Sequence, residues 1–171
     1  MEFFDAVKSR HSIRAFAATP IDGDKLQAIL EAANRAPSAG NLQAYEIYLV
    51  TQDRDRLALA RAALEQWFVA RAPVVLVFCA HPGRSARRYG QRGVRLYAIQ
   101  DATIACAFAM LAATALGLAT VWVGAFDDDS VRRAIRAPAD TVPVALLPVG
   151  YAGEVPETTS RRRLSNLVHE V

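Results

Sequence analysis

The longest apolar stretch of the chain, Ile104 to Val123, constrains the fold more than any other segment. A stretch of this length either crosses a membrane or lies in the middle of a protein core. Asp101 stands just before it, Thr114 interrupts it, and its second half becomes rich in β-branched residues. We therefore expect one long buried helix over about 97–116, ended by Gly117 and followed by a strand, and no membrane span.

Shorter apolar runs predict the strands of a sheet. The run at 73–80 (PVVLVFCA) has no polar position, which indicates a strand covered on both faces. Pro148 lies inside the last run and predicts an edge position or a local break there, because proline donates no backbone hydrogen bond. The other expected strands are 45–51, 119–126 and 143–151.

Helical spacing appears between these strands. We expect helices at 2–9, from an N-cap at Asp22 to about 36, at about 53–69 and at 127–135. The segment 81–93 is polar, basic and poor in periodicity, so we expect a loop or a mobile segment there, and a polar tail follows the last strand. Mixed helices and strands with short connections predict an α+β fold, a three-layer α/β/α sandwich around a central mixed sheet, with 1–171 as one domain.

Composition narrows the class of protein further. The chain has 53% hydrophobic and 22% charged residues and a formal charge of +3, which is typical of a globular protein. Among its 20 basic residues only Lys8 and Lys25 are lysines. This arginine excess reflects either genomic base composition or anion recognition, and the arginines form no basic stripe with interleaved aromatics, so we expect no nucleic-acid partner.

Two cysteines, Cys79 and Cys106, lie in apolar runs and are expected to be buried thiols. No histidine or cysteine stands at metal-ligand spacing, so no metal site is expected. The first residues lack the apolar core of a signal peptide, and we expect a cytoplasmic protein without a membrane partner.

Four segments carry groups that suit a ligand. In an extended chain Arg10, Ser12 and Arg14 point the same way and present charge-assisted donors to one anion. The small residues of 37–43 (PSAGNLQ) permit close approach of a flat ligand, with amide groups at Asn41 and Gln43. The other two segments are the strand end at 122–126 and the arginine triplet 161–163. Each alone also fits an ordinary role: a basic turn, a helix-to-strand loop, a buried strand end or solvated charge.

Taken in order, RHSIRAF, APSAGNLQ, GLATVWVGAFDDDSVR and VPVALLPVGYAGEVPE make the chain resemble the FMN-dependent nitroreductase family over essentially its whole length. The resemblance implies an intertwined homodimer with two FMN sites at its interface. The basic groups of one subunit would reach the phosphate and the N1/O2 edge of the flavin. The other subunit would lay the 37–43 loop against the ring and ribityl chain, and backbone at the 123–124 strand end would approach N5. The residues implied to bind FMN are Arg10, His11, Ser12, Arg14, Pro37, Ser38, Ala39, Asn41, Gln43, Val123, Gly124, Arg161 and Arg163.

The same resemblance implies an oxidoreductase that uses NADH or NADPH to reduce nitroaromatic, quinone or related electron-poor molecules. The reaction would be ping-pong hydride transfer through flavin N5, with no catalytic side chain and with Arg10 or Arg14 stabilising the reduced flavin. Alternatives are a specialised flavin enzyme of the same fold, a flavin- or nucleotide-binding protein without turnover, and a structural dimerisation domain.

Several points stay open at this stage. The pattern often has a small residue or proline followed by tryptophan after the position of Gln43, whereas this chain has Ala44 and Tyr45, so tyrosine replaces the tryptophan. The chain is shorter than many members, so 81–95 is either the roof of the substrate pocket or a surface loop. Asp101 is expected to be a helix cap or a structural partner. The residues leave undecided which arginine of 161–163 contacts phosphate, which nicotinamide is preferred and what the physiological substrate is.

Overall fold

The computed structural model describes residues 1–157 and 159–171. A four-stranded sheet in the order β1-β2-β4-β3 forms its middle layer, and every pairing between these strands is antiparallel. The sheet predicted as mixed is therefore antiparallel between its strands, and a parallel bridge between Ser12 and Thr120 lies outside the named strands. The strands are β1 (Tyr45–Val50), β2 (Val74–Ala80), β3 (Ala119–Thr120) and β4 (Val142–Gly150).

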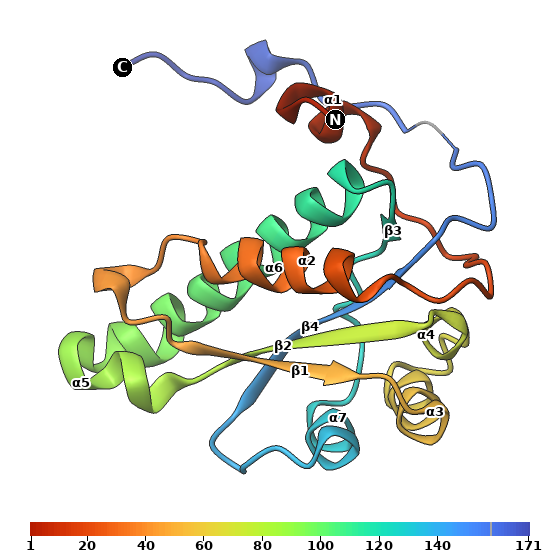
Figure 1. Cartoon of the computed structure of the whole chain (residues 1–171). Helices are drawn as coiled ribbons and strands as arrows, with labels where there is room; N and C mark the ends of the chain where they lie inside the picture. The colour runs from red at the N-terminus through yellow and green to blue at the C-terminus, as the bar shows by residue number, and fades with distance from the viewer. Residues whose placement is uncertain (158) are drawn as a thin grey trace.

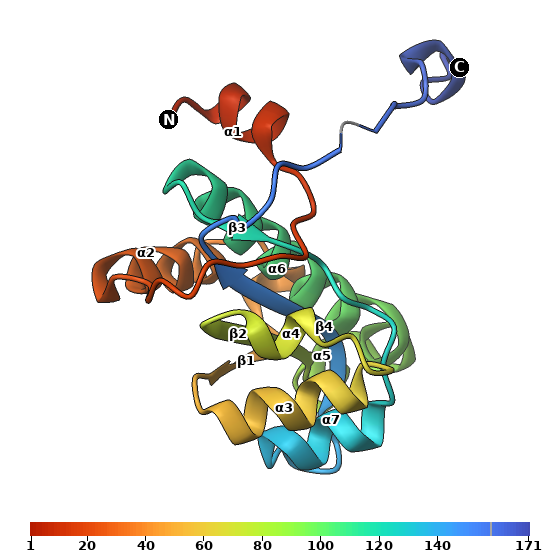
Figure 2. The same cartoon turned by 90° about the vertical axis from the view of Figure 1, so that its right-hand side faces the viewer.

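Helices cover both faces of the sheet (Figure 1 and Figure 2), which confirms the α+β three-layer prediction. Helices α2 and α6 pack on one face, and α3, α4 and α7 pack on the other. The helices are α1 (Phe3–Ser9), α2 (Gly23–Asn34), α3 (Asp53–Ala62), α4 (Phe68–Arg71), α5 (Pro82–Arg92), α6 (Ala98–Ala115) and α7 (Asp128–Ile135), with short turns η1 (Ala39–Asn41), η2 (Gly93–Tyr97) and η3 (Leu164–Asn166).

Strand β2 lies between β1 and β4 and is buried along its whole length, as its continuous apolar run predicted. Side chains alternate between the two faces of a strand. Leu76 and Phe78 therefore join the core under α2 and α6, whereas Val75 and Val77 join the core under α3 and α7. Burying each of these side chains contributes about 1.5–3 kcal/mol, so β2 ties the two layers of helices together.

Pro148 lies in an inner strand that continues through it to Gly150, so the predicted edge position is wrong and the strand itself is not broken there. Leu146 of β4 exchanges two backbone hydrogen bonds with Val123, on the side of the strand that faces β3. Residues two apart point their backbone groups to the same side, so the nitrogen of Pro148 also faces that side. Strand β3 has already ended at Thr120, and the proline therefore removes no ladder bond.

Helix α6 is the long buried helix that the sequence predicted, and Gly117 follows it at φ +76°. The helical stretch from Pro82 to Ala115 is long and apolar enough to cross a membrane. Within it, Ala102, Ala105 and Ala109 are fully buried against the sheet and α2. Small side chains let the helix approach the sheet closely, which supports the prediction of a core helix.

Three local predictions were wrong. Residues 81–93 form α5 and the start of η2 where a loop was expected, because His81 caps the helix and Pro82 begins it. The expected helix 53–69 breaks after α3, where Leu64 and Glu65 take positive φ angles. The strand expected at 119–126 is reduced to β3 and one bridge at Val123.

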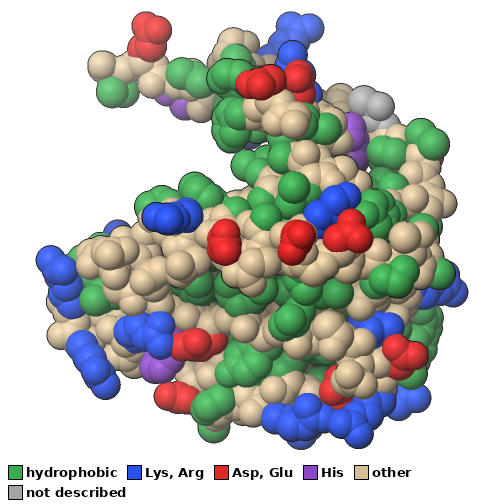
Figure 3. All heavy atoms as spheres, viewed as in Figure 1, with side chains coloured by type: hydrophobic (Ala, Val, Ile, Leu, Met, Phe, Trp, Pro, Cys, Tyr) green, Lys and Arg blue, Asp and Glu red, His purple; other side chains and the backbone are tan. Residues whose placement is uncertain are grey.

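The two ends of the chain extend beyond the sandwich. In Figure 1 and Figure 2, α1 and the segment after β4 project from the same end of the molecule. The space-filling view shows a deep hollow between this projection and the body below it (Figure 3). Phe3 and Phe4 on α1 are 63% and 74% exposed, and Leu164 in the tail is 75% exposed.

Candidate functional site

The basic segment after α1 is extended, and its side chains alternate as the sequence predicted. The N–H of Ile13 donates to the carbonyl of Thr120 at 3.0 Å, which attaches the segment to the end of β3. The side chain of Ile13 is buried, so Ser12 and Arg14 on either side of it face outward. Their direction is therefore fixed by the burial of an apolar neighbour.

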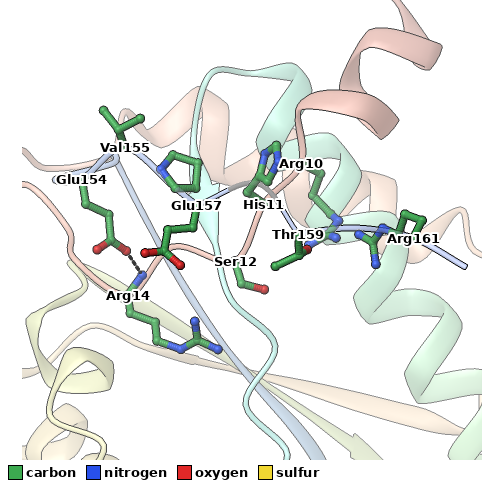
Figure 4. A pocket seen from close by; sticks show the side chains of 10 residues that line it. Arg10, His11, Ser12, Arg14, Glu154, Val155, Glu157, Thr159 and Arg161 are labelled. Carbon is green, nitrogen blue, oxygen red and sulfur yellow. Dashed lines mark hydrogen bonds between the residues drawn. The ribbon is translucent and has the colours of Figure 1, made fainter.

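A pocket of about 550 Å³ opens over this segment (Figure 4). It joins the early basic motif to the segment after β4, although the two are far apart in the sequence. Arg161 lies in its wall, whereas Arg162 donates to the carbonyl of Asn166 at 2.6 Å. The lining residues are Arg10, His11, Ser12, Arg14, Glu154, Val155, Pro156, Glu157, Thr159 and Arg161.

Glu154 holds the two walls of this pocket together, and sequence reasoning missed it. Its Oε1 accepts hydrogen bonds from the backbone N–H groups of Arg14 at 2.6 Å and Ala15 at 3.1 Å. The N–H of Gly153 donates to the carbonyl of Ala15 at 2.8 Å. Bonds from two amides to a carboxylate are charge-assisted, so they set where the Arg14 side chain leaves the backbone. The acidic residue in GYAGEVPE was the available signal.

The 37–43 loop follows α2 and has an unusual backbone. Gly40, Asn41 and Gln43 have φ angles of +57°, +55° and +47°. Glycine adopts this left-handed region freely and asparagine tolerates it, but for glutamine it costs about 1–2 kcal/mol. The N–H of Gln43 donates to Ser38 Oγ at 3.0 Å, and its side chain donates to Asn34 Oδ1 at 3.0 Å. The loop is thus held in a strained shape by its own polar groups, as backbone at binding sites often is.

Asp101 fixes both ends of this loop. It is only 2% exposed, and its Oδ1 accepts from the N–H of Ala39 at 2.9 Å. Its Oδ2 accepts from the N–H of Ala44 at 3.2 Å. The prediction of a structural partner is therefore confirmed, with the 37–43 loop as what it supports.

Helix α5 also holds the 37–43 loop. Arg84 donates to the carbonyl of Gln43 at 2.6 Å and forms an ion pair with Glu46. The phenol of Tyr45, which follows the loop, donates to the carbonyl of Ala33 at 3.1 Å, and burial raises the pKa of this phenol. The loop is thus bounded by α2, α5 and α6.

The two groups of predicted residues lie at opposite ends of α6. A second pocket, of about 460 Å³, includes Pro37, Ser38 and Ala39 beside the first turns of α6. His11 and Ile13 instead line a small cavity with Thr114 and Gly117 at the other end of that helix. At about 1.5 Å per residue, the two ends of α6 are more than roughly 20 Å apart. Within one chain the arginines and the 37–43 loop are therefore not brought together.

The two residues predicted at the strand end of 122–126, Val123 and Gly124, have different surroundings. The N–H and the carbonyl of Val123 are both bonded to Leu146 at 3.0 Å, and its side chain is 3% exposed. Gly124 is exposed, and a Cβ added to it would lie 3.2 Å from Trp122 Nε1. Any ligand that approaches this turn meets Gly124, because the backbone groups of Val123 are already used.

The cysteines offer no nucleophile. Cys79 and Cys106 are both fully buried, as predicted. Burial raises the pKa of Cys79 to about 12 and also raises the pKa of Cys106, so both remain neutral thiols near pH 7.

Comparisons with known proteins show which family and fold the chain resembles. The model of the nitroreductase family matches residues 7–81 and 67–151. An NADH dehydrogenase of Thermus thermophilus is 32% identical, over 95% of this chain and 93% of its own. The crystal structure of a nitroreductase family protein from Clostridium novyi NT is 33% identical with a TM-score of 0.81, covering 90% of this chain and 87% of that one. The structure of the NADPH:FMN oxidoreductase of Vibrio harveyi in complex with NAD+ is 28% identical with a TM-score of 0.89, covering 98% of this chain and 76% of that one.

Proposed function

The chain belongs to the nitroreductase family, and on that premise we propose that it is an FMN-dependent oxidoreductase that takes electrons from NADH or NADPH. Its electron acceptors are small, electron-poor molecules such as nitroaromatics and quinones. The observation that carries the proposal is that Arg10, Arg14 and Arg161 line one pocket.

The residues of this pocket fit the phosphorylated end of FMN. Guanidinium groups grip phosphate oxygens in two-point geometry, and the hydroxyl of Ser12 adds a further donor. Glu154 uses one carboxylate oxygen on two backbone amides. The lining holds three arginines and two acids, Glu154 and Glu157, so the pocket keeps a small excess of positive charge for an anion.

The 37–43 loop fits the flat part of the cofactor. The left-handed turn at Gly40 and Asn41 redirects the backbone at the exposed surface of the loop. Gly124 is exposed at the end of another segment and offers backbone without a side chain.

We further propose that each FMN site is built from two copies of the chain, with the arginine pocket of one and the 37–43 loop of the other. Two observations support this arrangement. The two half-sites lie at opposite ends of α6, and large apolar side chains are exposed on the neighbouring helices: Phe3 and Phe4 on α1, which precedes the arginine segment, and Ile99 and Phe108 on α6. Monomeric proteins rarely expose several such groups together, so a partner copy would bury them.

The chemistry that bound FMN supplies is ping-pong transfer of a hydride at its N5, from the nicotinamide and then to the acceptor. The chain itself binds and orients. Arg10 and Arg14 would hold the anionic end of the cofactor, and their fixed positive charge would favour its anionic, reduced form. Cys79 and Cys106 are buried and neutral, so neither takes part.

The first test is the colour and reduction of the purified protein. We expect a yellow protein with an FMN spectrum that NADH or NADPH bleaches under anaerobic conditions. Arg14→Ala should weaken FMN retention by roughly tenfold or more, because it removes a charge-assisted contact. Arg54→Ala is the matched control, since Arg54 is exposed on α3 and pairs only with its neighbour Asp55. A yellow protein that neither nicotinamide bleaches would instead indicate a flavin carrier, and a protein that ignores added FMN would refute the proposal.

Mixing two defective variants tests the shared site. A dimer of one Arg14→Ala chain and one Asn41→Ala chain contains one site with both changes and one intact site, if each site uses two copies. The mixed and re-associated sample should then regain up to one tightly bound FMN per dimer, although each variant alone binds FMN weakly. If both halves of a site came from the same chain, mixing would restore nothing.

A further inference from the structure

Helix α5 and turn η2 carry a cluster of two arginines and two tyrosines that the proposed function leaves unused. The rings of Tyr89 and Tyr97 meet edge to face, with centroids 5.0 Å apart. The guanidinium of Arg88 lies 5.5 Å from the centroid of the Tyr89 ring, and that of Arg92 lies 5.4 Å from the Tyr97 ring. Arg92 Nε also donates to the Tyr97 hydroxyl at 2.9 Å.

This cluster lies against the 37–43 loop. A Cβ added to Gly40 would lie 2.5 Å from the Tyr89 hydroxyl and 2.8 Å from Arg88 NH1, so the two side chains occupy the space that glycine leaves. Tyr97 also lines the pocket of Pro37, Ser38 and Ala39. Figure 1 shows α5 beside this loop at one end of the molecule, and in the same view Figure 3 shows basic side chains gathered at that end.

The charge of the cluster is not neutralised within the part of the chain that the structure describes. Arg84 on the same helix pairs with Glu46, whereas neither Arg88 nor Arg92 has a carboxylate within salt-bridge distance there. Both side chains are exposed, while Tyr89 and Tyr97 are half-buried. Arginines held by stacking on tyrosine rings lose less freedom when they bind an anion, so the cluster is partly organised for one.

The combination favours a ligand with both a phosphate and an aromatic ring. Unpaired guanidinium groups select phosphate over neutral groups, and a guanidinium plane held over a tyrosine ring can itself stack on a base. NADPH and NADH differ by one phosphate on the adenosine ribose, which carries about two negative charges near neutral pH. A subsite of this kind, next to the proposed flavin loop, discriminates between the two nicotinamides.

We propose that Arg88 and Arg92, with Tyr89 and Tyr97, bind the 2′-phosphorylated adenosine end of NADPH and make the enzyme prefer NADPH to NADH. This inference rests on the proposed function, because it assigns one of that reaction's substrates to a place on the molecule. Arg88 is the central residue, since it contacts both the flavin loop and the Tyr89 ring.

The test compares Arg88→Gln with Arg87→Gln. Arg87 has the same charge, is exposed, and points about 100° away around the helix. Anaerobic stopped-flow reduction of the FMN-loaded protein is followed with NADPH and with NADH. We expect Arg88→Gln to raise the apparent Kd for NADPH by roughly tenfold and to leave NADH nearly unchanged, as loss of a charge-assisted contact predicts. Arg87→Gln should leave the apparent Kd values for NADPH and NADH unchanged, and Arg88→Lys should keep part of the preference for NADPH over NADH.

A titration without turnover separates this inference from the proposed function. Adenosine 2′,5′-bisphosphate should bind the wild-type protein more tightly than adenosine 5′-monophosphate, and added salt and Arg88→Gln should both weaken it. If the protein holds no flavin, or if neither nicotinamide reduces it, the proposed function fails and this titration still decides the subsite. Three results would each overturn the inference. The wild type could use NADH and NADPH equally well, Arg88→Gln could weaken the binding of both nicotinamides equally, or adenosine 2′,5′-bisphosphate could fail to bind. If Arg88→Gln no longer retains FMN, the titration of the wild-type protein with the two adenosine phosphates decides whether the subsite exists.

Discussion

Replacing Asp101 with asparagine changes one oxygen of a buried carboxylate to an amide nitrogen with almost no change of shape. In the native protein both oxygens accept hydrogen bonds from loop amides, from Ala39 at 2.9 Å and from Ala44 at 3.2 Å. Asparagine has one acceptor oxygen, and its NH2 group would face the N–H group of the other amide. One end of the 37–43 loop therefore loses its anchor in Asp101→Asn.

The size of the effect follows from burial. Ala44 is fully buried, so its N–H cannot turn to water if Asp101 no longer accepts from it. A buried donor without a partner costs about 1–3 kcal/mol, and the bond that remains is weaker because the carboxylate charge is gone. We expect the free energy of unfolding to fall by about 2–3 kcal/mol. The left-handed φ angle of Gln43, which is costly by itself, would then relax.

Two measurements separate folding from cofactor binding. Urea unfolding of the apoprotein gives the loss of stability, and fluorescence titration with FMN gives the affinity. FMN must rebuild the loop in Asp101→Asn, so the Kd for FMN should rise by roughly tenfold, which corresponds to about 1.4 kcal/mol. Asp24→Asn is the control, because Asp24 is an exposed acid in the first turn of α2 and should change both values little.

Unchanged FMN affinity in Asp101→Asn would separate the loop from the flavin site, even if stability fell. Unchanged stability would contradict the hydrogen bonds themselves. If Asp24→Asn lowered stability as much as Asp101→Asn does, the loss would come from removing a negative charge and not from the buried hydrogen bonds of Asp101.

Other predictions follow from single contacts. Gly40→Ala, measured by urea unfolding and NADPH titration, should lower stability by about 1–2 kcal/mol because of its φ of +57°, and should weaken NADPH binding by displacing Arg88; normal binding would contradict the packing. Cys79 and Cys106 should resist a thiol reagent in the native protein and react in urea, since burial raises both pKa values; rapid native labelling would disprove their burial. The hydrogen bonds from Ser130 lower the pKa of the Asp127 carboxyl below its ordinary value. The ionised carboxylate therefore stabilises the fold at pH values above the ordinary pKa, and this contribution is lost as pH falls through the lowered pKa. Asp127→Asn should therefore make the acid end of the stability profile flatter, and an unchanged profile would argue against the cap.

Periodicity and composition alone predicted the layers of this protein. The uninterrupted run of β2 and the apolar surface of α6 leave burial as their only stable environment in water, so they had to lie in the core. The alternation around Ile13 likewise determined which way Ser12 and Arg14 face. The sequence also indicated the candidate ligand segments, among them 10–14 with its guanidinium groups and 37–43 with its small and amide residues.

Only the tertiary structure decided how these pieces meet. That α5 is a helix depends on a cap by His81 and on packing against the 37–43 loop, which local periodicity does not encode. Glu154 and Asp101 act through backbone amides far from them in the chain, and such contacts leave no spacing to recognise. The length of α6 keeps the arginine pocket and the 37–43 loop apart, because a helix fixes the distance between its ends. The sequence therefore determined which groups are available for a ligand, and the fold decided which of them one chain can bring together.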